Sequence, residues 1–126
     1  MAEDIRKAIL DALTKYGPAE QLGSADEMEA DLDQHISTAS IHSSISSDLN
    51  LRHRLVSQGR ILEENTVNHY YYCLIQLHGL FAPEALVVTI RDGTEIILGA
   101  FANDGSRSKR RSVQAIEQVK AALLQQ

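Results

Sequence analysis

The sequence contains one cysteine, Cys73, and no hydrophobic run that approaches the length of a membrane span. A single cysteine excludes an internal disulfide and a thiolate metal cluster, and the short hydrophobic runs predict no transmembrane helix. The first residues, MAEDIRK, lack the apolar core of a secretory signal. We therefore expect a soluble globular protein of the reducing cytoplasm, with one domain and an extension in its 126 residues.

Sequence motifs that are typical of catalysis are also missing. The chain has no glycine-framed serine elbow, no phosphate-cradling loop and no zinc-helix motif. None of its five histidines is close to another at the spacing of metal ligands. These absences predict a non-enzymatic protein without a metal, a cofactor or a small-molecule substrate. A small ligand-binding enzyme with a site around His69 and His78 is kept as a third alternative.

The net charge of −5 conceals a difference between the two halves of the chain. Residues 1–50 contain three basic and ten acidic residues, whereas residues 51–126 contain nine basic and seven acidic ones. The two halves are therefore expected to have different roles. A partner that is attracted by positive charge would meet the second half.

Residues 1–47 are predicted to form an acidic helical extension that ends in a linker. Apolar residues repeat with helical spacing over 4–16, and Gly17-Pro18 ends that helix. A capping-box sequence opens a second helix over about 24–36. The stretch 37–47 is rich in serine and threonine, which favours a linker, although a weak helix or a strand stays open. So short a segment buries little surface alone, so its apolar faces need a partner.

Residues 48–126 have the alternating and helical patterns of an α+β domain. A helix is expected over about 48–58, followed by an irregular connection, with a hairpin about Gln58-Gly59 as the alternative. Three period-two stripes predict antiparallel strands, and Asp92-Gly93 predicts a tight turn between the last two. A helix up to Leu124 follows, and both helices would cover one face of a three-stranded sheet. The stripes are Tyr71, Cys73, Ile75 and Leu77; Leu86, Val88 and Ile90; and Ile96, Leu98 and Ala100.

Four cations crowd the expected start of the last helix: Arg107, Lys109, Arg110 and Arg111. Cations are unfavourable there, because the N-terminus of a helix already carries partial positive charge. Their placement favours a docked anion, neutralised by the side chains and the free backbone amides together. Phosphates across the narrow major groove of duplex RNA would fit, with the other helix in a minor groove.

The order helix, three strands, helix over about residues 48–124 resembles the double-stranded RNA-binding domain family. The most telling portion is GSRSKRRSVQAIEQVKAALL, which is similar to the family's Gly-x-Ser-Lys-Lys entry to the last helix. Ser108, Lys109 and Arg110 stand at the Ser-Lys-Lys positions. LVSQGRI is similar to the end of the family's first helix, and Ala82-Pro83 followed by LVVTI is similar to its second strand.

The chain also departs from the family's pattern. A later lysine of the basic motif would fall at Val113 or Gln114, although Arg111 could replace it. The expected loop histidine would fall at Phe81, with His78 nearby. The glycine spacing before the basic helix is stretched.

The resemblance implies a non-enzymatic protein that binds double-stranded RNA by shape, or an RNA-associated accessory protein. The protein would then belong to a ribonucleoprotein, or to the core or packaging complex of a virus. Its expected location is therefore the cytoplasm or the inside of a virion core. The alternative is a protein-interaction, dimerisation or assembly module on a degenerate form of this fold. Tyr70 and Tyr72 lie opposite the core stripe and are candidates for a homodimer or assembly interface, or for packing by the N-terminal helices. The candidate RNA contacts are Arg52, Arg54, Gln58, His78, Arg107, Lys109, Arg110 and Arg111.

Overall fold

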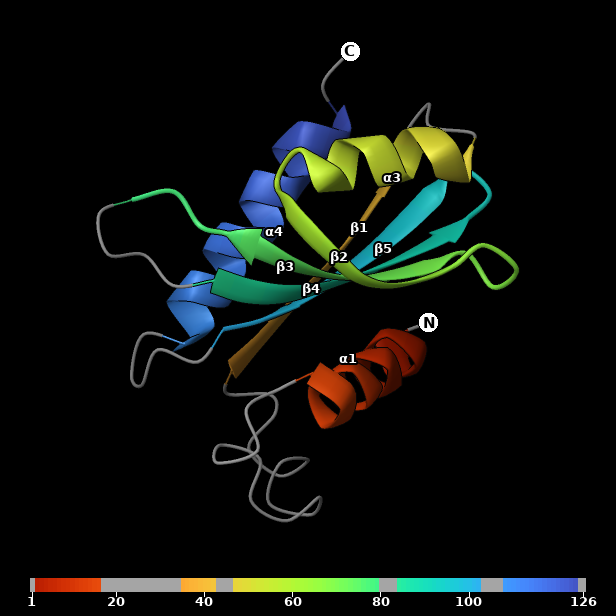
Figure 1. Ribbon diagram of the computed structural model, residues 1–126. Coiled ribbons are helices and arrows are strands. Elements are labelled where there is room, and N and C mark those ends of the chain that lie inside the picture. The colour runs from red at the N-terminus through yellow and green to blue at the C-terminus, as the bar shows by residue number, and fades with distance from the viewer. Residues whose placement is uncertain (1, 17–34, 43–46, 80–83, 103–107, 125–126) are drawn as a thin grey trace.

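The computed structural model describes residues 2–16, 35–42, 47–79, 84–102 and 108–124, which form three helices and a five-stranded sheet (Figure 1). None of these helices is long and apolar enough to cross a membrane. In chain order the elements are α1 (Ala2–Tyr16), β1 (Ile36–His42), α3 (Asp48–Val56), β2 (Gly59–Asn65), β3 (Tyr70–Gln76), β4 (Glu84–Asp92), β5 (Glu95–Phe101) and α4 (Ser108–Leu124).

The sheet has the strand order β1-β5-β4-β3-β2, and every neighbouring pair is antiparallel. Strands β2 to β5 form a meander in which each strand pairs with the next. β1 lies beside β5, so α3 carries the chain from one edge strand to the other (Figure 1). Asp92 pairs with Glu95, so the tight turn consists of Gly93 and Thr94, one residue later than predicted. Gly93 adopts a φ of 65°, which glycine tolerates without strain.

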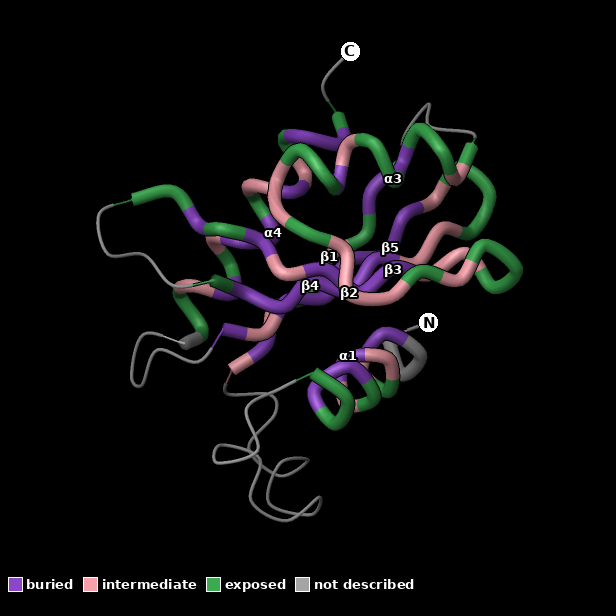
Figure 2. Tube along the Cα trace, in the orientation of Figure 1, coloured by how far each residue is buried: buried purple, intermediate pink, exposed green. Residues whose placement is uncertain are grey.

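α3 and α4 pack on one face of the sheet and enclose the larger core (Figure 2). Their inward residues repeat at helical spacing, and they meet the stripes predicted for β3 and β5. Tyr71, Cys73 and Ile75 of β3 are completely buried in this core. The helical contribution comes from Leu51 and Leu55 of α3 and from Ala115, Ile116, Val119 and Leu123 of α4.

α1 covers the opposite face of the sheet, so the protein has three layers (Figure 1). Ile5, Ile9 and Leu13 of α1 are buried against apolar residues of β3, β4 and β5. The close approach depends on Gly99 of β5. A Cβ atom there would lie 2.6 Å from Ile9 Cδ1 and 2.8 Å from Ile5 Cγ1. Since these distances are shorter than van der Waals contact, the missing side chain at position 99 provides the space for α1.

The broad α+β class is confirmed, but the predicted three-stranded, two-layer sandwich is wrong. The structure adds β1 in the stretch that was interpreted as a linker, and β2 in the expected irregular connection. Gln58-Gly59 joins a helix to β2 and is not a hairpin turn. The layout of the double-stranded RNA-binding domain is therefore not found. The helix expected over 24–36 lies outside the described residues except at its end, where Ile36 begins β1.

Candidate functional site

The cations predicted to bind RNA at the start of α4 are largely engaged within the protein. Lys109 Nζ donates a hydrogen bond to the Ile36 carbonyl of β1 at 2.5 Å. An Arg111 guanidinium nitrogen donates to Gln114 Oε1 at 3.0 Å. Arg110 is exposed, and Arg107 lies outside the described residues. Lys109 thus holds the start of α4 against the edge of the sheet.

The cations of α3 also contact other elements of this chain. Arg52 Nε lies 2.9 Å from a carboxylate oxygen of Glu64 on β2. An Arg54 guanidinium nitrogen donates at 3.0 Å to the carbonyl of Ala122, in the last turns of α4. Ala122 is thirteen residues from Lys109, about 20 Å along a helix. The structure therefore does not bring the arginines of α3 and the cations at the start of α4 into one patch.

Gln58 and His78, the two remaining RNA candidates, line an open groove of about 600 Å³ between α3, the end of β3 and α4. Gln118 of α4 donates to Gln58 Oε1 at 3.2 Å and to the Gln76 carbonyl at 2.8 Å. Its own side-chain oxygen accepts the His78 N–H at 3.1 Å, and Gln114 donates to the His78 carbonyl at 2.7 Å. These glutamine contacts fasten the segment after β3 to α4, so they have a structural role.

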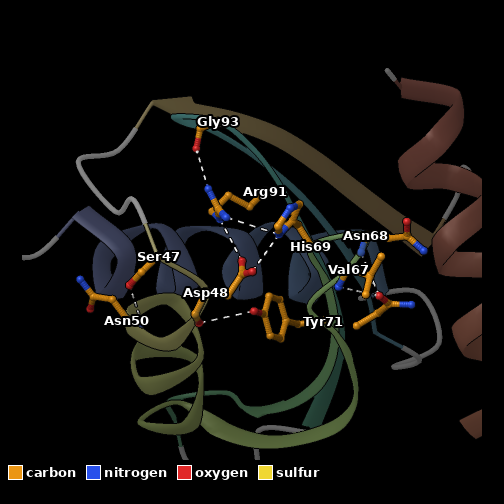
Figure 3. Close-up of polar contacts among 10 residues, drawn as sticks. Ser47, Asp48, Asn50, Val67, Asn68, His69, Tyr71, Arg91 and Gly93 are labelled. Carbon is orange, nitrogen blue, oxygen red and sulfur yellow. Dashed lines mark hydrogen bonds and ion pairs between the residues drawn. The ribbon is translucent and has the colours of Figure 1, made fainter.

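A partly buried polar cluster joins the start of α3 to the end of the sheet where the β2–β3 turn lies (Figure 3). Asp48 accepts hydrogen bonds from Arg91 Nε at 2.9 Å and lies 2.8 Å from His69 Nδ1. Burial favours the neutral form of Asp48, but the hydrogen bonds from Arg91 and His69 outweigh this effect and lower its pKa. His69 has a φ of 59°, which is uncommon for a residue other than glycine. The cluster therefore positions α3 over the sheet.

The two histidines of the third alternative do not form one site. His69 precedes β3 and His78 follows it, so they lie at opposite ends of the strand. Within the described part of the chain, no three histidine, cysteine, aspartate or glutamate side chains gather as potential metal ligands. The pairing of Asp48 with Arg91 could not be predicted from local sequence patterns, because the two residues are 43 positions apart.

The tyrosines predicted to form an interface lie beneath and beside α1. Tyr72 is 3% exposed, and its hydroxyl donates to Asp11 of α1 at 2.8 Å. Tyr70 stacks on Tyr72 with ring centroids 5.0 Å apart. Its hydroxyl donates to Glu63 at 3.0 Å, and the Tyr16 hydroxyl donates to the same carboxylate at 2.7 Å. Tyr72 is therefore not accessible to a second protein while α1 is in place.

The two edge strands of the sheet differ in how well they are protected. β2 contains the charged residues Arg60, Glu63 and Glu64, and its register with β3 shifts between Ile61 and Glu63. Charged side chains and bulges of this kind prevent an edge from pairing with another strand. β2 is therefore a poor template for a further strand.

β1, the opposite edge, has none of these features. Its sequence, ISTASIH, contains no lysine, arginine, aspartate, glutamate or proline. All seven residues pair with β5 in one unbroken register, from Ile36 opposite Phe101 to His42 opposite Glu95. No described strand pairs with its outer side. Thr38, Ser40 and His42 are exposed. β1 is the candidate functional site. Its serine and threonine content favoured a linker, and the structure agrees with the strand that was left open as an alternative.

The family and protein comparisons identify no relative. None of the protein-family models matches this chain, and no curated protein is significantly similar to it. The resemblance to the RNA-binding family therefore stays a prediction. The function has to be argued from the geometry of the chain.

Proposed function

We propose that this protein is a non-enzymatic interaction module that binds an extended segment of a partner protein along the outer edge of β1. The observation that supports this function is the seven-residue, uncharged and unbulged edge. In strand addition, backbone N–H and C=O groups of an edge supply affinity, and alternate side chains supply specificity. Since β2 has the usual protections of an edge and β1 lacks them, β1 is the strand at which pairing is expected.

Binding of duplex RNA is the second candidate, and its support is the basic start of α4. Three considerations place it behind the protein partner. Arg52 is paired with Glu64, and Arg54 spans to the other end of α4. Lys109 is bonded to β1. The net charge of −5 also opposes long-range attraction to phosphates.

A peptide selection on the full-length chain tests the proposal. Random heptapeptides would be selected, since β1 has seven residues. We expect the selected peptides to shift the backbone amide resonances of residues 36–42. Methylating alternate amides of such a peptide should weaken binding at least tenfold, because each lost hydrogen bond contributes about 1 kcal/mol. Two results would contradict strand addition. The selected peptides could shift resonances other than those of residues 36–42, or they could keep their affinity when each of the two alternate sets of amides is methylated in turn.

A duplex RNA titration at two salt concentrations decides the second candidate. Binding to phosphates releases counterions, so the affinity would fall steeply as salt increases. Tight, strongly salt-dependent binding of RNA that shifts the resonances of residues 108–111 would favour the RNA function over ours. Weak binding with no preference for duplex RNA over another polyanion would favour the protein partner.

A further inference from the structure

The pairing of the inner strands determines which backbone groups of β1 face its open side. In an antiparallel pair, residues that exchange hydrogen bonds alternate with residues whose N–H and C=O groups point away from the partner strand. Arg91 of β4 donates its N–H to the His69 carbonyl, on the β3 side. Its neighbour Asp92 is therefore bonded to Glu95 of β5. Continued through β5, this alternation bonds three residues of β1 to β5: Ser37, Ala39 and Ile41.

The remaining residues of β1 direct their N–H and C=O groups outward: Ile36, Thr38, Ser40 and His42. Lys109 donates a hydrogen bond to the Ile36 carbonyl, which agrees with the outward direction of that group. No described strand pairs with the other three residues. Residues 38–42 are therefore the part of β1 that is open to a further strand, and we call them the open edge.

The open edge pairs fully with itself in the antiparallel register that is centred on Ser40. With Ser40 of two copies opposite each other, Thr38 of each copy lies opposite His42 of the other. Each of these pairs exchanges both of its hydrogen bonds. A shift in one direction would pair Ile36 with His42 and would need the carbonyl that Lys109 already occupies. A shift in the other direction would shorten the pairing, so the register centred on Ser40 is favoured.

The side chains of the open edge also match across this pairing. Opposite residues of an antiparallel pair lie on the same face of the sheet. Ala39 and Ile41 pack with the core on the α4 face, and the register places Ala39 of one copy against Ile41 of the other. On the α1 face the two Ser40 side chains meet. β1 contains no lysine, arginine, aspartate or glutamate, so no like charges of the two strands are opposed.

A second copy presents this segment already in the extended form. β1 is paired with β5 along its whole length, so it loses little conformational entropy on binding, unlike a segment that is disordered before it binds. α4 packs on both β1 and β5, so its axis lies about half a strand spacing inside the edge. The axes of the two α4 helices would then be about two strand spacings apart, or roughly 10 Å. Helices pack against each other at such a distance.

We infer that the partner is a second copy of this chain, and that the two β1 strands pair antiparallel about a two-fold axis at Ser40. The inference rests on the proposed function and names the partner at that same site. The two sheets then form one continuous sheet, with both α1 helices on one face and both α4 helices on the other.

Mass and amide exchange of the full-length protein test the pairing directly. The molar mass measured by sedimentation should double as the concentration rises from about 1 μM to about 1 mM, the range of affinities expected for a small interface. At the high concentration the amides of Thr38, Ser40 and His42 should become protected from exchange. The amides of Ala39 and Ile41 should be protected at both concentrations, because they are bonded to β5. A dimer in which the first three amides still exchange rapidly would overturn the inference.

A pair of charge variants at the two-fold axis tests the register. Ser40 is exposed, so Ser40→Lys and Ser40→Glu should both fold, which circular dichroism would verify. Each variant places like charges opposite each other and should dimerise roughly three- to tenfold more weakly than the parent. An equimolar mixture should recover the affinity of the parent, because lysine then faces glutamate. Two weakened variants that do not recover when mixed would contradict the register.

The matched control carries the same charges at the other edge of the sheet. Thr66 is exposed in the turn between β2 and β3, and β2 lies at the edge opposite β1. Thr66→Lys and Thr66→Glu should therefore dimerise like the parent, alone and mixed. A dimer that is weakened by the Thr66 variants and not by the Ser40 variants would place the interface elsewhere and overturn the inference.

The outcomes separate this inference from the proposed function. A protein that stays monomeric up to about 1 mM, but whose selected heptapeptides shift the resonances of residues 36–42, would overturn the second copy and leave strand addition at β1 in place. A protein that neither dimerises nor selects a peptide at those residues would overturn both. A dimer that a selected heptapeptide splits into monomers would support both, because the peptide and the second copy then compete for one edge.

Discussion

Replacing Gly99 with alanine tests the packing of α1 on the sheet directly. The new Cβ would lie 2.6 Å from Ile9 Cδ1, 2.8 Å from Ile5 Cγ1 and 3.2 Å from Ile9 Cγ1. The Cδ1 atom is at the end of a flexible side chain, but Ile5 Cγ1 is not, so α1 has to move away from β5. Overpacking of this kind lowers the free energy of unfolding by about 1–3 kcal/mol. Replacing a glycine in a strand raises it by roughly 0.5–1 kcal/mol, because alanine loses less backbone entropy on folding.

We therefore expect Gly99→Ala to lower the free energy of unfolding by about 1–2 kcal/mol, which urea denaturation would measure. A double-mutant cycle with Ile9→Val identifies the cause. That variant removes Cδ1, at a cost of about 0.5–1.5 kcal/mol on its own, and should reduce the penalty of Gly99→Ala. Ile5 Cγ1 remains in place, so the relief should be partial. A stabilising Gly99→Ala variant, or additive effects of the two substitutions, would refute the packing described for α1.

Two further predictions concern groups on the other side of the sheet, one partly buried and one fully buried. Asp48→Asn should lower the free energy of unfolding at pH 7 by about 1–3 kcal/mol, because Arg91 and His69 lose a charged partner. Since the folded-state pKa of Asp48 is lowered, its contribution is complete above the unfolded-state pKa and is lost as pH falls through the folded-state value. Urea titrations should therefore show the two proteins converging in acid, and a constant difference would contradict the pairing. Burial raises the pKa of the Cys73 thiol to about 12, so a thiol reagent at pH 8 should label it only as fast as the protein opens; rapid labelling of the folded protein would count against its burial.

The elements with strong hydrophobic periodicity could be predicted from the sequence. The stripe of Tyr71, Cys73 and Ile75 is completely buried, as expected for β3. Ile5, Ile9 and Leu13 face the core from α1. In these elements one face is apolar over several helical turns or several alternate strand residues. The local sequence pattern therefore predicts the same buried face as the tertiary packing.

β1 and β2 could not be predicted in the same way, because edge strands bury little. In β1, Ile36 packs on the α1 side of the sheet and Ile41 on the other, so no apolar stripe marks one face. The bulge in β2 interrupts its alternation between Ile61 and Glu63. The candidate site depends on this arrangement. Lys109 was predicted as a phosphate contact from its position in the sequence, but only the sheet shows that it lies beside an edge.

The bulge in β2 also limits how many copies of the protein could pair edge to edge through their sheets. Were both edges open, one copy could pair its β1 with the β2 of the next, and such a head-to-tail contact continues into an open-ended fibre. The shifted register at Ile61 and Glu63 and the charges of β2 block that second step. Growth of the sheet is then possible from one side only. If a segment adds to β1 as proposed, no open edge is left for a further strand, and we expect a stoichiometry of one segment per molecule.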